Sequence, residues 1–497
     1  MSRRAATALV AAFLALGAAL RLYHFWVPEL WNDEYGTWWA VAGDWGETAR
    51  RVVRFAGQSP LYYFLVKLVA DGLGPGPFAL RLLSLVCGVL TVTLAYPLGL
   101  RVFRDRYAAV LAVATFAVND RLISYSQDAR PYSLALVLTM LATVVYLRLL
   151  DGNGGPAARA AYLATVLALF YVHYLFAVVV LVHVAYLGLR RRLTWLREPA
   201  WVAPYLALAV LALPGLAHLA MISSRRQVMS WFGQGAEAPF TLAVQMVDPL
   251  VFTAVGLAVL AVGFDASSRG VADTAARRDF VLLWFLLPIG ILGLAGWALG
   301  VALLYSRYAL AMAPAGLLML AWLMAAGRRT PRLRWVPLAT GLVAATIWYL
   351  VPALASVSVF ASRPVEAWGR VARAIDESGR AGDAILVQSG FVEGDLLARG
   401  PVDPSLVSGL TWPLVANLRA RDQYQVIALP YRASAETLPY VEAVSASVRD
   451  RPRVWVVGSS EAVTQAARVL VNDGRRRVVG RAAFDGTIVL LVATGPE

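Results

Sequence analysis

Long apolar segments recur along the first 357 residues, and the short stretches between them carry most of the charge of this region. A helix needs about 20 predominantly apolar residues to cross the hydrocarbon core of a bilayer. The pattern therefore predicts a mainly α, polytopic membrane protein with about 11 transmembrane helices. The expected segments are 7–26, 79–100, 107–119, 131–150, 158–172, 174–189, 200–222, 241–263, 281–299, 303–326 and 335–357.

The pattern changes after residue 357, where short β-branched runs alternate with amphipathic stretches. Strands that alternate with helices are typical of an α/β domain with a largely parallel sheet. We therefore predict a transmembrane domain over residues 1–357 and a small soluble α/β domain over residues 358–497. The expected strands are 384–387, 425–428, 453–457 and 487–492, and the expected helices include 364–380 and 460–472.

A long loop, residues 27–78, separates the first two transmembrane segments. Its first part, up to residue 58, holds five of the 16 acidic residues found before residue 358. The stretch 59–68 that follows is apolar but too short to cross a bilayer, and it carries two tyrosines and Lys67. Such a segment is typical of a helix that lies in the membrane interface, so we expect interfacial helices in this loop.

The composition agrees with a membrane protein and excludes several other classes. Hydrophobic residues make up 59% of the chain and charged residues 15%, with a mean hydropathy of +0.62. Soluble domains carry about 25% charged residues. The single cysteine, Cys87, excludes an intrachain disulfide, and one cysteine with four histidines excludes a Cys/His zinc cluster.

The net charge of +14 is concentrated in the first 357 residues, which hold 29 basic and 16 acidic residues. The arginines form short clusters between apolar segments, which is typical of the cytoplasmic side of a membrane protein rather than of a nucleic-acid surface. With the N-terminus inside, 18 of the 29 basic residues fall on the inner side and 11 on the outer side. We therefore predict a cytoplasmic N-terminus and, after 11 helices, a C-terminal domain outside.

Two adjacent carboxylates, Asp33 and Glu34, lie a few residues beyond the first transmembrane segment, among several tryptophans. A carboxylate at an apolar interface is costly unless it is paired or takes part in chemistry. One interpretation is a general base, or a ligand for a divalent cation, that deprotonates an acceptor hydroxyl or amine. The other is a solvated loop whose tryptophans form an interfacial belt.

Two arginines, each with a tyrosine nearby, are predicted on the same outer side. Arg130 and Tyr132 lie between the third and fourth segments, and Arg307 and Tyr308 lie at the start of the tenth. A guanidinium group matches phosphate geometry and stays charged, so both pairs are candidates for a phosphate site. The alternatives are a structural contact within the loop for Arg130 and, for Arg307, a side chain that reaches the lipid headgroups. His173, predicted on the same side, is either a site residue or a structural histidine.

These features resemble glycosyltransferase family 39 and its bacterial relatives, which include the protein O-mannosyltransferases and the lipid A aminoarabinose transferases and share the GT-C fold. The resemblance rests on the N-terminal helix, on Asp33-Glu34 in the outer loop and on Pro60-Leu61-Tyr62 at the start of the interfacial helix. It extends over roughly residues 5–330 and includes the segments Arg81-Leu82-Leu83-Ser84, Ala129-Arg130-Pro131-Tyr132-Ser133-Leu134 and Arg307-Tyr308.

The resemblance implies transfer of a sugar from a polyprenyl-phosphate carrier on the non-cytoplasmic face of a bacterial plasma membrane. The first Asp of the pair is the catalytic base in that family, and Asp33 occupies its place, with Glu34 beside it. Relatives often have His-Pro-Pro or Lys-Pro before the interfacial helix, whereas this chain has Gln58-Ser59-Pro60, so Arg307 or Arg54 must supply that charge here. The donor-binding candidates are Gln58, Tyr62, Arg130, Tyr132, His173, Arg307 and Tyr308.

Positive charge is needed beside the leaving lipid phosphate, and either arginine or a divalent metal can supply it. Mg²⁺ or Mn²⁺ is therefore the cofactor that the sequence leaves open, with Asp33 and Asp128 as candidate ligands. The expected partners are the polyprenyl-phosphate-linked sugar, a lipid, glycan or protein acceptor, and the lipid bilayer, with no nucleic acid.

A transporter or flippase and a membrane-anchored binding protein are the alternatives to a glycosyltransferase. A transporter or flippase of lipid-linked sugars would carry charges near the bilayer midplane, in the broken helices of repeated halves. Here the notable charges cluster at outer helix ends, and the sequence shows no such repeat. A membrane-anchored binding protein would not need 11 helices, so the sequence favours the enzyme.

Overall fold

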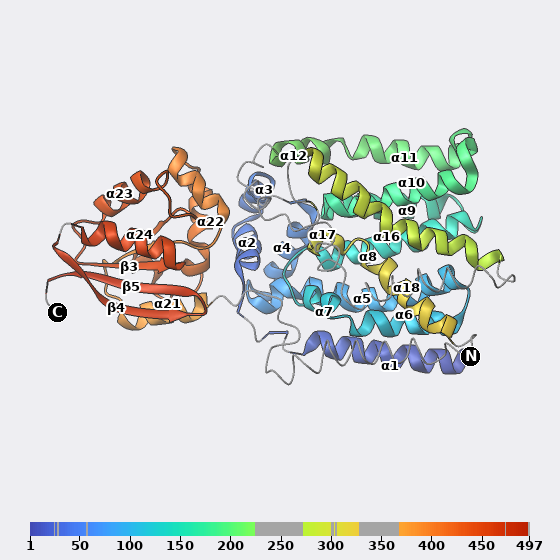
Figure 1. The fold of residues 1–497 in the computed structure, drawn as a ribbon, viewed down its shortest axis with the longest axis horizontal. Helices are drawn as coiled ribbons and strands as arrows, with labels where there is room; N and C mark the ends of the chain where they lie inside the picture. Colours follow the sequence, from blue (N-terminus) through green and yellow to red (C-terminus); the bar gives the residue numbers. More distant parts are fainter. Residues whose placement is uncertain are drawn as a thin grey trace. The chain divides into compact units, whose positions relative to one another are not determined.

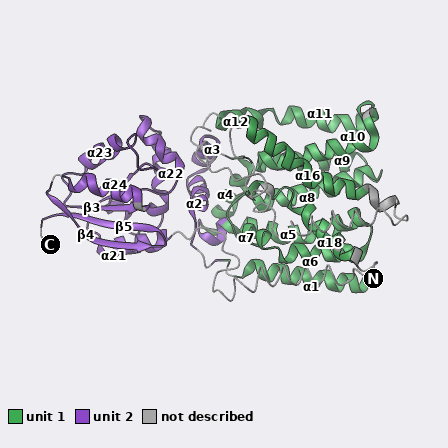
Figure 2. Ribbon diagram, in the orientation of Figure 1, with its two compact units in different colours: residues 1–25, 57–74, 81–362 green, residues 26–56, 75–80, 363–497 purple. Residues whose placement is uncertain are grey.

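The computed structural model describes residues 1–23, 25–26, 29–55, 58–223, 272–299, 303, 306–327, 367–472 and 474–495. The chain divides into two compact units (Figure 2). Unit 1 comprises residues 1–25, 57–74 and 81–362, and unit 2 comprises residues 26–56, 75–80 and 363–497. The acidic first part of the loop after the first helix is thus counted with the C-terminal residues. The two domains drawn from the sequence, 1–357 and 358–497, stay a prediction.

Unit 1 is built from helices (Figure 1). Their order is α1 (Arg3–Leu22), α4 (Leu61–Leu73), α5 (Pro77–Phe103, whose first residues belong to unit 2), α6 (Arg106–Val118), α7 (Asp120–Ser126), α8 (Tyr132–Leu150), α9 (Pro156–Val172), the 3₁₀ turn η1 (Tyr174–Ala177), α10 (Val178–Arg191), η2 (Arg192–Arg197), α11 (Pro199–Leu211), α12 (Leu213–Ser223), α16 (Ala272–Leu299), α17 (Ser306–Ala309) and α18 (Ala313–Gly327).

The length and hydropathy of the helices confirm a multi-pass integral membrane protein. Within the described part of the chain, five helical segments are long and apolar enough to cross a bilayer, and the number rises to seven if each of two bent pairs is one span. The bent pairs are α6 with α7, at 57°, and α11 with α12, at 46°. Two of the expected segments, 241–263 and 335–357, lie outside the described residues, so the total of about 11 stays a prediction.

A buried histidine fastens three of the unit 1 helices to one another. His183 on α10 has a neighbour at each ring nitrogen: the hydroxyl of Tyr162 from α9 lies 2.9 Å from Nδ1, and that of Thr143 from α8 lies 3.2 Å from Nε2. The hydroxyl of Tyr146 donates to the His183 carbonyl at 2.7 Å. Polar groups in an apolar core are stable when their partners are supplied internally, so this histidine has a structural role.

The break between α6 and α7 is closed by a buried arginine. Asn119 takes extended dihedral angles there, and its side chain caps α7 by accepting from the backbone N–H of Leu122 at 3.0 Å. The last carbonyl groups of α6 have no N–H partner within the helix. Arg21 of α1, which is fully buried, donates to the carbonyls of Ala117 at 3.0 Å and Phe116 at 3.1 Å. The positive group also suits the negative end of the helix dipole.

Unit 2 contains a five-stranded sheet with the order β2-β1-β3-β5-β4. Its strands are β1 (Ala384–Val387), β2 (Gln425–Ala428), β3 (Arg453–Gly458), β4 (Arg476–Phe484) and β5 (Thr487–Thr494). The first three are parallel, but β5 pairs antiparallel with both β3 and β4. The expectation of a largely parallel sheet is therefore wrong in part. A tight turn at Asp485-Gly486 joins β4 to β5 as a hairpin, which forces antiparallel pairing.

Helices complete unit 2 on both sides of the sheet (Figure 1). The helices at 368–378 and 460–471 confirm the two amphipathic stretches expected from the sequence. The helical elements of unit 2 are α2 (Asn32–Val41), α3 (Trp45–Arg54), α21 (Trp368–Ser378), the 3₁₀ segments η5 (Val392–Arg399) and η6 (Arg421–Gln423), α22 (Pro404–Val415), α23 (Leu438–Ser447) and α24 (Ser460–Val471).

The orientation predicted from the arginines can be tested with single cysteines. Ala443 on α23 and Asn153 between α8 and α9 are both exposed, and the native Cys87 is buried. In a Cys87→Ala background, Ala443→Cys should react with a membrane-impermeant maleimide in intact cells. Asn153→Cys should react only after permeabilisation, because it belongs to an arginine-rich inner loop. The reverse pattern of labelling would overturn the orientation.

Candidate functional site

The chain breaks at His173, between α9 and η1, and this break positions the centre of a polar cluster in unit 1. His173 takes extended dihedral angles (φ −160°, ψ 106°) between two helical segments. Ser59 fastens both sides of the break: its hydroxyl donates to the Phe170 carbonyl at 3.2 Å and accepts from the backbone N–H of Tyr174 at 3.0 Å. Ser59, which directly precedes Pro60 ahead of α4, thus satisfies backbone groups on both sides of the break.

Aromatic rings surround the His173 imidazole. Ring centroids lie 5.6 Å away for Tyr132, 4.8 Å for Phe176 and 5.7 Å for Tyr308. The histidine is only 6% exposed, and neither ring nitrogen has a hydrogen-bond partner among the described residues. A buried polar group left without a partner costs about 1–3 kcal/mol, so it calls for an explanation. A bound ligand is one such explanation.

Arg130 and Arg307 act electrostatically on the same imidazole. Burial, followed by the positive charges of Arg130 and then Arg307, lowers the pKa of His173 to about 3. The ring is therefore neutral near pH 7, with one nitrogen able to donate and the other to accept. Two cationic side chains and one neutral ring thus occupy the same region of unit 1.

The backbone around Arg130 is held by its neighbours. Arg130 is 7% exposed, its N–H donates to the Asp128 carbonyl at 2.7 Å, and its own carbonyl accepts from the Ser84 hydroxyl at 3.2 Å. Ser84 belongs to the segment Arg81-Leu82-Leu83-Ser84 on which the resemblance partly rests, but the sequence gave no sign that its hydroxyl would contact the Arg130 carbonyl. Arg307 on α17 lies over the Tyr308 ring, 5.4 Å from its centroid.

Tyr62 of α4 lies close enough to Arg130 to feel its charge, whereas Gln58 contacts Tyr63 instead. Tyr62 is fully buried, and burial raises the pKa of its hydroxyl, with a smaller contribution in the same direction from Asp128. This hydroxyl stays protonated and able to donate. Gln58 accepts from the Tyr63 hydroxyl at 3.4 Å. We call Tyr62, Arg130, Tyr132, His173, Arg307 and Tyr308 the His173 cluster.

Asp33 and Glu34 lie in the first turn of α2, in unit 2, and have different surroundings. Glu34 is fully buried, and its Oε2 accepts from the backbone N–H of Trp31 at 3.4 Å, as the N3 residue of a capping box. Asp33 is half-buried. A carboxylate at this position is favoured by the N-terminal end of the helix dipole.

Contacts within unit 2 hold α2 in place. The Tyr35 hydroxyl accepts from Asn417 Nδ2 at 2.7 Å, and the Trp38 ring meets Trp412 edge-on, with centroids 6.0 Å apart. Ahead of α2, the Glu29 carboxylate accepts from the Gly369 N–H at 3.0 Å, at the N-terminus of α21. The segment that carries Asp33 is thus packed against residues more than 300 positions away in the chain.

The described residues contain no preformed set of metal ligands, because no three His, Cys, Asp or Glu side chains come together among them. Of the two candidate ligands, Asp33 belongs to unit 2 and Asp128 to unit 1. Asp128 is 3% exposed, and its charge reaches Tyr62. The divalent cation stays a prediction.

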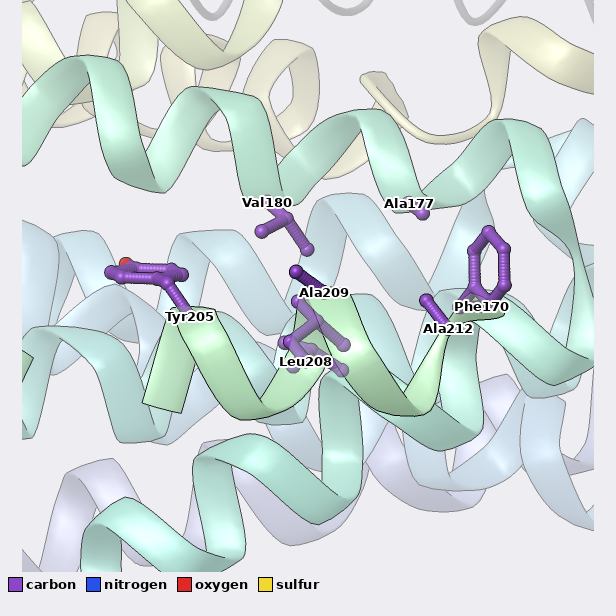
Figure 3. Close-up of a pocket in the computed structure, with 8 residues that line it drawn as sticks. Phe170, Ala177, Val180, Tyr205, Leu208, Ala209 and Ala212 are labelled. Atoms are coloured by element: carbon purple, nitrogen blue, oxygen red, sulfur yellow. The ribbon is translucent and has the colours of Figure 1, made fainter. Parts of the chain in front are cut away.

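An apolar cavity of about 250 Å³ lies between α9, α10 and α11 of unit 1 (Figure 3). Its lining is apolar apart from the hydroxyl of Tyr205. Two lining residues, Phe170 and Ala177, flank His173 in the sequence at three and four positions. The full lining is Val166, Phe170, Ala177, Val180, Tyr205, Leu208, Ala209 and Ala212.

Comparisons with solved structures confirm the GT-C fold expected from the resemblance. ArnT from Cupriavidus metallidurans in the apo state matches with a TM-score of 0.52 and 16% identity, over 99% of this chain and 100% of that one. ArnT bound to undecaprenyl phosphate matches with 0.56 and 14% over the same shares. The Archaeoglobus fulgidus oligosaccharyltransferase tethered to an acceptor peptide matches with 0.56 and 11%, over 100% of this chain and 74% of that one.

No protein-family model matches this chain, and no curated protein sequence does. The similarity is therefore one of fold.

The neutral state of His173 predicts a pH dependence of stability. Its pKa of about 3 lies below the value near 6.5 of an unfolded histidine, so the unfolded chain binds the extra proton between these pH values. Stability should therefore fall as the pH drops below 6.5, by about 1.4 kcal/mol per pH unit from this residue. His173→Phe should lose less stability than the wild type between pH 7 and pH 5, as measured by thermal unfolding in detergent. Equal losses in both proteins would contradict a buried neutral imidazole.

Proposed function

We propose that the protein is a membrane glycosyltransferase that transfers a sugar from a polyprenyl-phosphate donor to a lipid, glycan or protein acceptor on the non-cytoplasmic face. The observation that carries the proposal is the His173 cluster, in which two arginines act on a buried neutral imidazole whose nitrogens lack partners among the described residues. The GT-C fold supports it, because ArnT is known bound to undecaprenyl phosphate in that fold.

The His173 cluster has the groups that a leaving phosphate requires. Arg130 and Arg307 supply permanent positive charge, which stabilises the negative charge that grows as the bond to the sugar breaks. The Tyr62 hydroxyl and one nitrogen of His173 supply neutral hydrogen bonds. A phosphate oxygen at His173 would also satisfy a nitrogen that is otherwise costly to bury.

An apolar chain on the donor would be accommodated by the cavity between α9, α10 and α11. The cavity lining is almost entirely apolar, as isoprenoid groups require. Because Phe170 and Ala177 flank the His173 break, the same short segment serves both the polar cluster and the apolar cavity. An amphiphile with a phosphate at one end fits such a segment better than a wholly polar substrate does.

Asp33 is the proposed general base. The acceptor oxygen or nitrogen attacks the anomeric carbon, the bond between that carbon and the phosphate oxygen breaks, and Asp33 takes the acceptor's proton. A single displacement of this kind inverts the anomeric configuration. Glu34 accepts from the Trp31 N–H in the capping box, and this contact suits a role in holding the first turn of α2.

The alternative function, a transporter or flippase of lipid-linked sugars, would move the donor without consuming it. It is separated from the enzyme by the fate of the carrier. Purified protein incubated with a panel of polyprenyl-phosphate sugars, together with a membrane extract that supplies lipid, glycan and protein acceptors, should release polyprenyl phosphate if it is a glycosyltransferase. Intact donor with only a change of leaflet in vesicles would favour the flippase.

Loss of either arginine should weaken donor binding. A charged contact to a phosphate contributes about 1.5–3 kcal/mol, so Arg130→Ala or Arg307→Ala should reduce affinity for undecaprenyl phosphate about 10- to 100-fold. Arginine-to-lysine variants should recover only part of it, since the forked geometry is lost. Binding can be followed by native mass spectrometry, with the exposed Arg197→Ala as control. Wild-type affinity in both alanine variants would remove the arginines from the site.

Removing the charge of Asp33 should abolish most of the turnover. Asp33→Asn keeps the side-chain shape but removes nearly all its basicity, so kcat should fall about 10²–10⁴-fold while donor binding changes little. The readout is released polyprenyl phosphate at saturating donor. Asp422→Asn is the matched control, because that side chain is 96% exposed in the same unit.

Glu34→Gln separates the two carboxylates. A glutamine oxygen can still accept from the Trp31 N–H, so this variant should retain far more activity than Asp33→Asn. Near wild-type turnover in Asp33→Asn, at unchanged melting temperature, would rule out Asp33 as the base.

A further inference from the structure

Three ends of membrane-spanning segments in unit 1 meet at one carboxylate. Asp151 follows the last turn of α8, Arg101 lies in the last turn of α5, and Arg277 begins the spanning part of α16. Arg277 donates to both the Asp151 carboxylate and the Arg101 carbonyl. Arg101 and Arg104 place their guanidinium nitrogens 3.8 Å and 3.7 Å from the same carboxylate. We call these four residues the Asp151 cluster.

Counted over its four residues alone, the Asp151 cluster holds more positive than negative charge. Three guanidinium groups share one carboxylate, which leaves a net charge of +2. The Arg277 side chain is 11% exposed and hydrogen-bonded to Asp151, whereas those of Arg101 and Arg104 are 30% and 54% exposed. Like charges held together at this distance favour binding of an additional anion.

Positive charge also predominates in the neighbouring stretches that the structure describes. Asp105 caps the N-terminus of α6 by accepting from the N–H groups of Tyr107 and Ala108. Asp279 is exposed on α16, where Arg278 lies over the Trp322 ring. Arg148, which donates to the Asn153 carbonyl at 2.8 Å, and Arg106 add further positive charge. The stretches 101–106, 148–151 and 277–279 together contain six arginines and three aspartates.

The position of the cluster identifies the kind of anion. α5, α8 and Arg277–Leu299 are each long and apolar enough to span a bilayer, so their shared ends lie at the level of the lipid headgroups. Arginine recognises phosphate through paired N–H groups, and basic pockets at helix ends hold anionic lipid headgroups. We infer that the Asp151 cluster binds the phosphate of an anionic phospholipid of the surrounding membrane, with Arg101 and Arg104 as the contacts and Arg277 and Asp151 holding them in place.

This inference does not depend on the proposed function. A simple excess of arginine on one side of the membrane would set the orientation without gathering three guanidinium groups around one carboxylate. A binding site, by contrast, requires that arrangement and predicts selectivity for the headgroup.

The test uses the delipidated full-length protein in detergent, with phosphatidylglycerol, phosphatidylcholine and inorganic phosphate as probes. Native mass spectrometry should show phosphatidylglycerol retained, and thermal unfolding should show that this lipid raises the melting temperature more than phosphatidylcholine does. Arg101→Gln/Arg104→Gln should bind phosphatidylglycerol at least tenfold more weakly. Arg192→Gln/Arg197→Gln removes the same charge from exposed positions near η2 and should bind it like the wild type.

Three outcomes would overturn the inference: equal retention of both lipids, wild-type affinity in the Arg101/Arg104 variant, or an equal loss in the control variant. Stabilisation by inorganic phosphate that matches phosphatidylglycerol would assign the cluster to a soluble anion and would also overturn it. The single variant Arg104→Gln, at the more exposed position, replaces the double variant if that protein does not fold, and it should still bind more weakly.

Discussion

Broken helices inside an apolar solvent must find partners for the backbone groups they expose, and this constraint organises unit 1. Water is absent from the hydrocarbon core, so an interrupted helix needs side chains from elsewhere in the chain to satisfy its ends. Arg21 does this for the end of α6, and Ser59 does it on both sides of the α9–η1 break. The α6–α7 break lies within one candidate span, whereas the break at His173 lies ahead of the span Tyr174–Arg191, and at both a polar side chain satisfies the exposed backbone groups.

The break at His173 lies at the centre of the candidate site. Ser59 satisfies the backbone, which leaves the imidazole itself without a structural task among the described residues. Compare His183, whose two nitrogens both have hydroxyl neighbours within 3.2 Å and whose role is to fasten helices. The two histidines are similarly buried, and the difference between them is whether their hydrogen bonds are satisfied internally. Burial, followed by the positive charges of Arg130 and Arg307, lowers the pKa of His173 and keeps its ring neutral.

At two helix N-termini of unit 2, carboxylates rather than arginine or serine side chains satisfy backbone groups. Glu34 and Glu29 both bind backbone N–H groups near helix N-termini, the first at α2 and the second at α21. These contacts engage two of the carboxylates in the acidic first loop and fix the segment on which Asp33 lies. Asp33 itself remains half-buried in the first turn of α2. This position suits the role of base that we propose for Asp33, because the helix holds the carboxylate while part of it is exposed.

Much of the architecture followed from the sequence by itself. Runs of about 20 apolar residues can be stable only across a bilayer, so the membrane helices and the change of character after residue 357 were determined by composition and spacing alone. The sequence also predicted strands β1, β2, β3 and β5, because each of them is a short apolar run. β4 was missed, since an edge strand rich in arginine lacks that pattern. Its hairpin with β5 made the sheet mixed.

Only the tertiary structure decided which polar residues work together. The sequence marked Arg130, His173 and Arg307 separately, but burial and proximity showed that the two arginines act on one imidazole. The resemblance assigned the base to Asp33 and left the role of Glu34 open, and only the structure showed that Glu34 accepts from the Trp31 N–H in a capping box. Ser59, Arg21 and the Asp151 cluster carried no recognisable pattern, because a hydrogen bond to a distant carbonyl depends on where helices end in space. Local sequence determines the elements, whereas the partners of buried polar groups come from segments far apart in the chain.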